Sequence, residues 1–283
     1  MTPHRLGILH PGEMGISLAA SAQNSGREVY WVSDGRSPAT QARAARLGLR
    51  DAGSLATLCA TCEVVVSVCP PHAAEAQARD VVAAGFRGLY VDANAVSPHR
   101  AVAMGRLMAE AGVSFVDGGI IGGPAWKPGS TWLYLAGPNA ATAAACFAAG
   151  PLETRILGDE IGTASALKMC YAAYTKGTTA LLGAVLATAD RLGVREALYQ
   201  QWNQDGADFA EGVNRRVRGA TGKAWRFVGE MEEIAATLDA AGLPPGFHLA
   251  AADVYRRLAP FKGAADTPSL EAVLTALLES EPF

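Results

Sequence analysis

The first half of the chain alternates short apolar runs with segments of helical periodicity. The run at residues 64–69 is continuously apolar and rich in β-branched side chains, as expected for a strand covered on both faces of a parallel sheet. The spacing predicts strands at 5–9, 28–33, 64–69, 88–92 and 114–117, with edge strands at 132–136 and 154–157, and helices at 16–25, 40–47, 72–84 and 98–112. This alternation predicts a doubly wound α/β domain with a parallel sheet.

The pattern changes after Gly158, and no later segment predicts a strand. Residues 163–192 predict one long helix without proline, along which small side chains such as Gly177 and Gly183 would let other helices approach closely. Residues 225–238 have apolar positions three and four apart, which indicates an amphipathic helix. We therefore expect an α/β domain at residues 1–158 and an all-helical domain at 159–283, joined by the long helix.

Composition and charge exclude several classes of protein. The net charge is −3, with no basic stripe for nucleic acid, and no apolar stretch approaches the ~20 residues of a membrane helix. The N-terminus lacks the features of a signal peptide, and the five cysteines form an odd set, so we expect a cytoplasmic protein with reduced thiols. Cys59 and Cys62 have no second pair or nearby histidines, so no metal site is predicted.

A glycine-rich turn follows the first predicted strand. Residues 6–15 read LGILHPGEMG, in which an H-x-G-x-x-G pattern stands at the entry to a helix. In a dinucleotide-binding turn, one glycine lets the backbone approach the pyrophosphate and another lets helix and strand pack tightly. The alternative is a tight turn without a ligand. We favour a Rossmann domain whose cofactor contacts include His10, Pro11, Gly12, Glu13 and Met14.

The end of the second predicted strand bears on the choice of cofactor. Asp34 would suit the ribose 2′-hydroxyl of NAD, whereas Arg36 would suit the 2′-phosphate of NADP, because a guanidinium matches phosphate geometry. Ser33 and Ser37 add hydroxyl donors beside Arg36. We therefore predict NADP as the preferred cofactor, with NAD as the alternative.

Four motifs in order give the chain a resemblance to a known family. They are HPGEMG at residues 10–15, CPPHAA at 69–74, DANAVSP at 92–98 with DGGIIGG at 117–123, and GTASALKMCYAAYTKG at 162–177. The chain resembles the β-hydroxyacid dehydrogenase superfamily, which includes 6-phosphogluconate dehydrogenase, 3-hydroxyisobutyrate dehydrogenase and imine reductases. More narrowly, it is similar to 6-phosphogluconate-dehydrogenase-like proteins whose helical C-terminal domain has no assigned function. The resemblance implies a nicotinamide-dependent oxidoreductase, a small-molecule substrate bound between the domains, and a homodimer.

The resemblance also implies roles for individual residues. Lys168 takes the position of the family's general acid/base, and it is the only cation between Thr163 and Tyr174 on a small, apolar helix. Partial burial there would favour the neutral amine that accepts a proton. The alternative is a lysine that extends to solvent from a packed helix. Asn94 falls where the family contacts the nicotinamide ribose, and Cys69 and Pro70 fall on the adenosine side.

The substrate loop departs from the family pattern. Ile121 replaces a serine that binds the substrate carboxylate, and Ala172 replaces an asparagine four residues after the lysine. An apolar or aromatic substrate portion therefore suits this chain better than a small hydroxy acid. The residues predicted to line the substrate site are Ile121, Gly122, Gly123, Trp126, Tyr171, Tyr174 and Thr175.

These expectations define a leading function and two alternatives. We predict an NADP-preferring enzyme that transfers hydride between the cofactor and an alcohol or carbonyl substrate, with Lys168 as acid/base. An imine reductase shares the fold, but such enzymes commonly have Asp or Tyr at the lysine position. A dinucleotide-binding sensor without catalytic activity is the alternative from another class.

Overall fold

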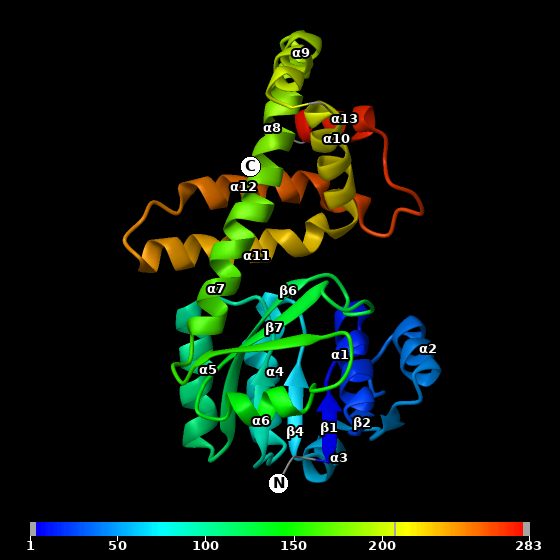
Figure 1. Cartoon of the computed structure of the whole chain (residues 1–283), viewed down its shortest axis with the longest axis vertical. Helices are drawn as coiled ribbons and strands as arrows, with labels where there is room; N and C mark the ends of the chain where they lie inside the picture. The colour runs from blue at the N-terminus through cyan, green and yellow to red at the C-terminus, as the bar shows by residue number, and fades with distance from the viewer. Residues whose placement is uncertain (1–3, 207, 280–283) are drawn as a thin grey trace. The chain divides into compact units, whose positions relative to one another are not determined.

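The protein consists of two compact units. The computed structural model describes residues 4–206 and 208–279. Contacts divide the chain into Met1–Met169 and Cys170–Phe283, so the division falls within the long helix that the sequence predicts. Figure 1 shows the sheet and its helices in the first unit and the helices of the second. None of the helices in the described ranges is long and apolar enough to cross a membrane.

The first unit is built on one sheet with the order β3-β2-β1-β4-β5-β6-β7-β8. Its strands are β1 Arg5–Ile8, β2 Glu28–Trp31, β3 Arg50–Asp51, β4 Val64–Ser67, β5 Leu89–Asp92, β6 Ser114–Gly122, β7 Thr131–Ala136 and β8 Glu153–Gly158. β1 to β6 are parallel, β7 is antiparallel to β6, and β8 is parallel to β7. The order reverses between β1 and β4, which is the switch point where ligands bind in open α/β sheets.

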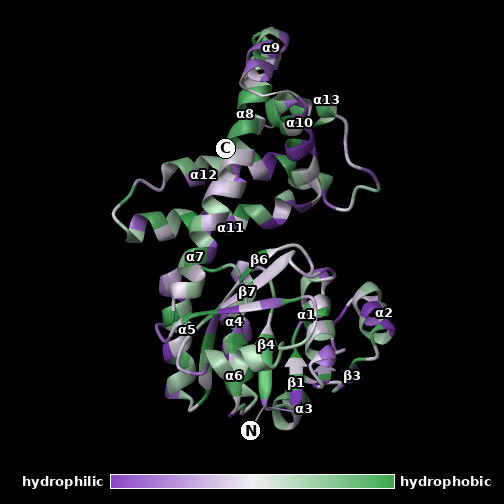
Figure 2. Cartoon of the chain, viewed as in Figure 1, coloured by the Kyte–Doolittle hydropathy of each residue, from purple (hydrophilic) through white to green (hydrophobic). Residues whose placement is uncertain are grey.

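Helices cover both faces of this sheet. One face packs against α1 Glu13–Asn24, α2 Pro38–Arg46 and α6 Ala140–Ala145, and the other against α3 Leu55–Thr61, α4 Ala74–Ala83 and α5 Pro98–Glu110. β4 illustrates the arrangement, because Val64 and Val66 belong to one core and Val65 to the other, and all three are fully buried. Figure 2 shows the apolar character of β4. The continuous apolar run is thus explained by burial on both faces.

Several details of the first unit differ from the sequence-based prediction. β7 was expected at an edge, but it lies between β6 and β8. β6 continues to Gly122, so residues 117–122, expected as a substrate loop, belong to a strand that pairs with β7. Strand β3 and helix α6 were not predicted, because β3 has only two residues and α6 is an alanine-rich segment without amphipathic spacing.

The described residues of the second unit form helices joined by turns and short connections, with no strand. Helix α7 Thr163–Ala172 passes into a π-helical turn at Ala173–Gly177 and then into α8 Thr178–Arg191, without a break. The later helices are α9 Arg195–Asp205, α10 Phe209–Ala220, α11 Ala224–Ala240, α12 Gly246–Leu258 and α13 Leu270–Glu279. At Gly183 a Cβ would lie 3.6 Å from both Leu277 and Val217. This small residue therefore lets α13 and α10 pack on α8, as predicted.

Candidate functional site

The glycine loop leaves an open space in front of the first helix. A Cβ on Gly12 would meet no atom within 4 Å, whereas a Cβ on Gly15 would lie 2.1 Å from the carbonyl oxygen of His10. Gly15 is therefore required for α1 to pack against the loop, while Gly12 keeps the backbone accessible. No side chain caps the N-terminus of α1. Its first N–H groups can thus bind an anion such as a pyrophosphate.

Two polar atoms beside this loop are buried without a hydrogen-bond partner among the described residues. They are Nδ1 of His10 and Nε of Arg36. Burial, and then the charge of Arg36, lower the pKa of His10 to about 4, so its imidazole is neutral near pH 7. Burial also lowers the pKa of Arg36, and the carboxylate of Asp34 opposes this effect. A buried donor without an acceptor is costly, and a phosphate or ribose group would supply the acceptor.

The hydroxyl groups near Arg36 differ in their surroundings. The Ser37 hydroxyl accepts a hydrogen bond from the backbone N–H of Thr40 at 3.3 Å and is the N-cap of α2. Ser33 is half-buried at the end of β2, whereas Asp34 is exposed. Ser37 therefore has a structural task of its own, and its contact with a cofactor stays a prediction, as does that of Ser33.

Asn94 joins the ends of β4 and β5. Its Oδ1 accepts a hydrogen bond from the backbone N–H of Cys69 at 2.5 Å, and its Nδ2 donates to Ser67 Oγ at 3.1 Å and to Asp92 Oδ1 at 2.5 Å. With only 3 % of its surface exposed, this side chain fixes the turn that contains Cys69 and Pro70. Burial raises the pKa of Cys69 to about 11, so its thiol stays protonated. Contacts of these three residues with a cofactor remain predictions.

Two buried carboxylates lie on adjacent strands, because Asp92 in β5 is the register partner of Asp117 in β6. Burial, together with the nearby Asp117, raises the pKa of Asp92 to about 7, although the hydrogen bond from Asn94 opposes this rise. Oδ2 of Asp92 is buried without a hydrogen-bond partner in the described ranges. Burial likewise raises the pKa of Asp117, against its hydrogen bonds to Ser165.

Asp117 fastens helix α7 to strand β6. Its Oδ2 accepts hydrogen bonds from the N–H groups of Gly162 at 2.9 Å and Ser165 at 3.0 Å, and its Oδ1 accepts one from the Ser165 hydroxyl at 2.6 Å. The carboxylate thereby satisfies donors at the start of the helix, which also places a negative charge at the positive end of the helix dipole. Sequence reasoning placed Asp117 in a substrate loop and missed this role.

Lys168 lies one turn beyond this fastening, on the face of α7 that contacts the sheet. A Cβ on Gly119 would lie 2.6 Å from the carbonyl oxygen of Ala164 and 3.1 Å from Cβ of Lys168. The helix can approach β6 this closely only because residue 119 has no side chain. Lys168 is half-buried. The structure therefore places the base of this side chain directly over β6.

The other predicted substrate residues belong to two groups. In the first unit, Ile121 is buried within β6 and pairs with Trp132 of β7, while Gly122 and Gly123 are exposed where the strand ends. In the second unit, Tyr171 and Tyr174 are 47 % and 71 % exposed. The hydroxyl of the neighbouring Thr175 donates to the carbonyl of Tyr171 at 3.0 Å.

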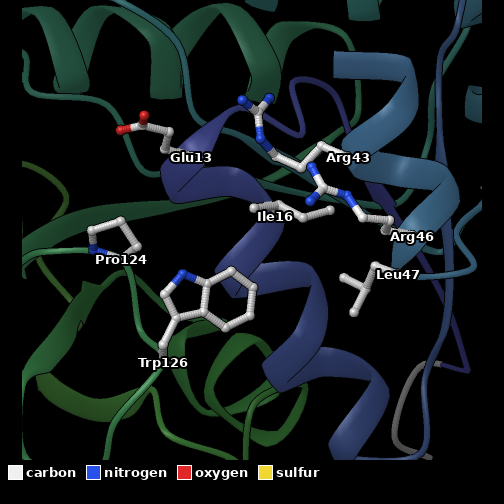
Figure 3. Close-up of a pocket in the computed structure, with 7 residues that line it drawn as sticks. All are labelled: Glu13, Ile16, Arg43, Arg46, Leu47, Pro124 and Trp126. Atoms are coloured by element: carbon white, nitrogen blue, oxygen red, sulfur yellow. The ribbon is translucent and has the colours of Figure 1, made fainter. Parts of the chain in front are cut away.

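Trp126 lines a cavity of about 470 Å³ on the outer side of α1. Figure 3 shows its indole ring across the cavity from the side chains of Arg43 and Arg46, with Glu13 at one end. Nη1 of Arg43 donates to the carbonyl of Pro11 at 3.3 Å, so this cavity adjoins the glycine loop. Two residues predicted for separate sites, Glu13 for the cofactor and Trp126 for the substrate, thus line one cavity.

The described residues offer little support for a metal site or for a reactive Cys59–Cys62 pair. They contain no group of three or more His, Cys, Asp or Glu side chains placed to hold a metal ion. Cys59 and Cys62 are free and buried, and burial raises the pKa of their thiols to about 11 and about 12. These thiols are therefore protonated and unreactive at neutral pH.

Two family models match the chain. The NAD binding domain of 6-phosphogluconate dehydrogenase matches residues 5–146, and a domain of unknown function, DUF1932, matches residues 189–258. The chain belongs to the 6-phosphogluconate dehydrogenase NAD-binding family. The predicted resemblance is therefore confirmed, as is a Rossmann domain followed by a helical C-terminal region.

Solved structures agree with this assignment. A conserved protein of unknown function, described as structurally similar to 3-hydroxyacid dehydrogenases, is 31 % identical, with a TM-score of 0.66 over 90 % of this chain and 96 % of that chain. The Mycobacterium tuberculosis 3-hydroxyisobutyrate dehydrogenase with L-serine is 18 % identical and has a TM-score of 0.71, and the match covers 97 % of this chain and 99 % of that chain. A Myxococcus stipitatus imine reductase variant in complex with NAD+ is 19 % identical and has a TM-score of 0.55, and the match covers 99 % of this chain and 100 % of that chain. The latter two share the fold with this chain, which is that of NAD(P)-binding oxidoreductases.

Proposed function

We propose that this protein is an NADP-dependent oxidoreductase that interconverts an alcohol and a carbonyl compound, with Lys168 as general acid/base. One observation supports this role above the others. Lys168 is half-buried on helix α7, whose start is hydrogen-bonded to Asp117 of β6. The helix packs closely against β6 because Gly119 has no side chain. A base whose helix is fixed in this way begins each reaction cycle in the correct position, which can account for much of a catalytic rate.

The cofactor supplies the hydride chemistry when it is bound, and the protein supplies position and proton transfer. The first N–H groups of α1 would hold the pyrophosphate, and the guanidinium of Arg36 would hold the 2′-phosphate. Nζ of Lys168 would accept the hydroxyl proton of the substrate during oxidation and return it during reduction. The apolar side chain of Ile121 would face a substrate portion without charge.

Replacement of Lys168 tests the proposal directly. Purified Lys168→Met protein should bind NADPH as the wild type does, while turnover of its best alcohol or carbonyl substrate falls at least 100-fold. Lys127→Met, at an exposed lysine of the same unit, is the matched control and should leave both quantities unchanged. Equal turnover in Lys168→Met and wild type would exclude Lys168 from the mechanism.

Replacement of Arg36 tests the cofactor preference. Arg36→Ala should weaken NADPH binding about tenfold and leave NADH binding nearly unchanged, because a charge-assisted hydrogen bond contributes about 1.5–3 kcal/mol and this group is partly exposed. Fluorescence titration of both cofactors measures the two constants. A parallel loss for NADH would show that Arg36 does not distinguish the 2′-phosphate.

Imine reduction is the second candidate, since Ile121 and Ala172 are both buried and apolar. A panel of cyclic imines, ketones and aldehydes with NADPH distinguishes the two activities, and faster imine turnover would replace the leading proposal. Tight NADPH binding without turnover of any panel member would instead favour a sensor.

We further propose that the protein is a homodimer, which light scattering on the full chain tests.

A further inference from the structure

The turn that follows β4 is held by side chains from the end of β5 and from α5. Residues 69–71 read Cys-Pro-Pro, and Cys69 carries the only backbone N–H among them, because proline has none. That N–H donates to Oδ1 of Asn94 at 2.5 Å. The carbonyl of Pro71 accepts a hydrogen bond from Nη2 of Arg100 at 3.2 Å. The shape of this turn therefore depends on the positions of two side chains.

The turn lies beside the glycine loop. β4 is the neighbour of β1 in the sheet, and the N–H of Leu9 donates to the carbonyl of Val66 at 3.1 Å. Burial raises the pKa of the Cys69 thiol, and the nearby charge of Arg36 opposes this rise. The turn is thus close to both groups proposed above to hold the cofactor. A dinucleotide at the switch point of the sheet would pass it.

The side-chain amide of Asn94 has both of its N–H groups bonded within the protein. A backbone N–H can only donate, so the amide oxygen must face Cys69 and the NH₂ group must face the other way. This group donates to Ser67 Oγ at 3.1 Å and to Asp92 Oδ1 at 2.5 Å. No N–H of Asn94 is left for a ribose hydroxyl. We therefore expect Asn94 to affect a bound cofactor through the turn that it fixes.

Asp92 supplies an acceptor that orients this amide. Its Oδ1 can accept from Asn94 in either protonation state, because a carboxylic acid keeps an acceptor oxygen. The side chain is fully buried, and its Oδ2 has no hydrogen-bond partner in the described part of the chain. A buried polar atom without a partner costs stability, and an apolar side chain in this strand would avoid that cost. A costly carboxyl group at the carboxyl end of β5 indicates a functional role.

We propose that Asp92 is a positioning residue for the dinucleotide, which acts through Asn94 to hold the turn at residues 69–71 in the shape that receives the cofactor. The inference rests on the proposed function, since it needs a cofactor at the glycine loop. A turn that is fixed beforehand does not have to be ordered when the cofactor binds, so the affinity is higher. Asp92 itself need not touch the cofactor for this effect.

The test is fluorescence titration of the full chain with NADPH, together with thermal unfolding. Asp92→Val removes the acceptor and should weaken NADPH binding about fivefold, which corresponds to the loss of one hydrogen bond. Its Tm should stay near that of the wild type, because the lost bond and the removed buried carboxyl group have opposite effects on stability. Asp92→Asn keeps an oxygen for Asn94 and should bind NADPH as the wild type does. Asp80→Val, at an exposed carboxylate of α4, is the matched control and should change neither quantity.

A double variant tests whether Asp92 acts through Asn94. Asn94→Ala leaves the N–H of Cys69 without this acceptor and should weaken NADPH binding at least tenfold, with an unchanged circular dichroism spectrum. In that background, Asp92→Val should weaken binding no further, because the residue through which it acts has been removed.

The outcomes separate this inference from the proposed function. Equal affinity of Asp92→Val and wild type for NADPH, a loss in Asp92→Asn as large as in Asp92→Val, or additive losses in the double variant would overturn the inference alone. Failure of the wild type to bind either NADPH or NADH would overturn the proposed function as well.

Discussion

The contact between Asp117 and the start of α7 offers the sharpest test of how the fold positions Lys168. In Asp117→Asn, the amide oxygen can still accept from the N–H groups of Gly162 and Ser165, and the amide NH₂ can donate to the Ser165 hydroxyl. The geometry is thus preserved while the charge is lost. Three bonds change from charge-assisted to neutral, and the variant also avoids the cost of a buried charge.

The magnitude follows from these opposing terms. A hydrogen bond to a carboxylate contributes about 1.5–3 kcal/mol and a neutral one about 1 kcal/mol, and the gain from removing a buried charge offsets part of the difference. We expect a net destabilisation of about 1–2 kcal/mol, which corresponds to a fall in Tm of roughly 2–8 °C. Asp117→Ala leaves the donors buried without a partner and should cost about 4 kcal/mol.

The assay combines thermal unfolding with steady-state kinetics. Because Asp117 acts through the position of α7, Asp117→Asn should lower kcat severalfold and leave the Kd for NADPH unchanged, since a base displaced by about 1 Å can lose up to 100-fold in rate. Asp159→Asn, at an exposed carboxylate of the same unit, is the control and should change neither Tm nor kcat. A lower Tm with an unaltered kcat would refute a positioning role for Asp117.

Three further predictions concern the same unit. Gly12→Ala should weaken NADPH binding at least tenfold with little change in Tm, because the added Cβ meets no protein atom. Gly15→Ala should instead lower Tm, because its Cβ would lie 2.1 Å from a backbone oxygen. Equal effects of the two substitutions on Tm would argue against this distinction. Gly119→Ala should lower both Tm and kcat, because its Cβ would lie 2.6 Å from the carbonyl oxygen of Ala164, and an unchanged kcat would contradict the close contact between α7 and β6. Burial raises the pKa of Asp92 to about 7, so the folded protein retains a proton that the unfolded chain releases near pH 4, and stability is lost as the pH rises through this window. Asp92→Asn should therefore raise Tm over wild type by an amount that grows from pH 5 to pH 8, and a pH-independent difference would contradict the raised pKa.

The sequence alone determined that the first unit is a doubly wound α/β domain. Continuous apolar runs such as Val64–Ser67 and the glycine pattern around Gly12 and Gly15 reflect constraints between near neighbours along the chain. Strand alternation, helix periodicity and close backbone packing at glycine can all be recognised in short stretches of sequence. For the same reason the sequence could predict the long helix and single out Lys168 as the only cation between Thr163 and Tyr174.

The tertiary structure decided the roles that depend on residues far apart in sequence. Asp117 bonds to Ser165, 48 residues later, so its part in fixing α7 has no local signature. The π-turn likewise depends on Arg216 and Tyr255, and helical periodicity cannot show that their side chains bond its carbonyl groups. Hydrophobic spacing indicates which face of an element is buried, but it does not indicate which polar group accepts each hydrogen bond, and the position of Lys168 depends on such bonds.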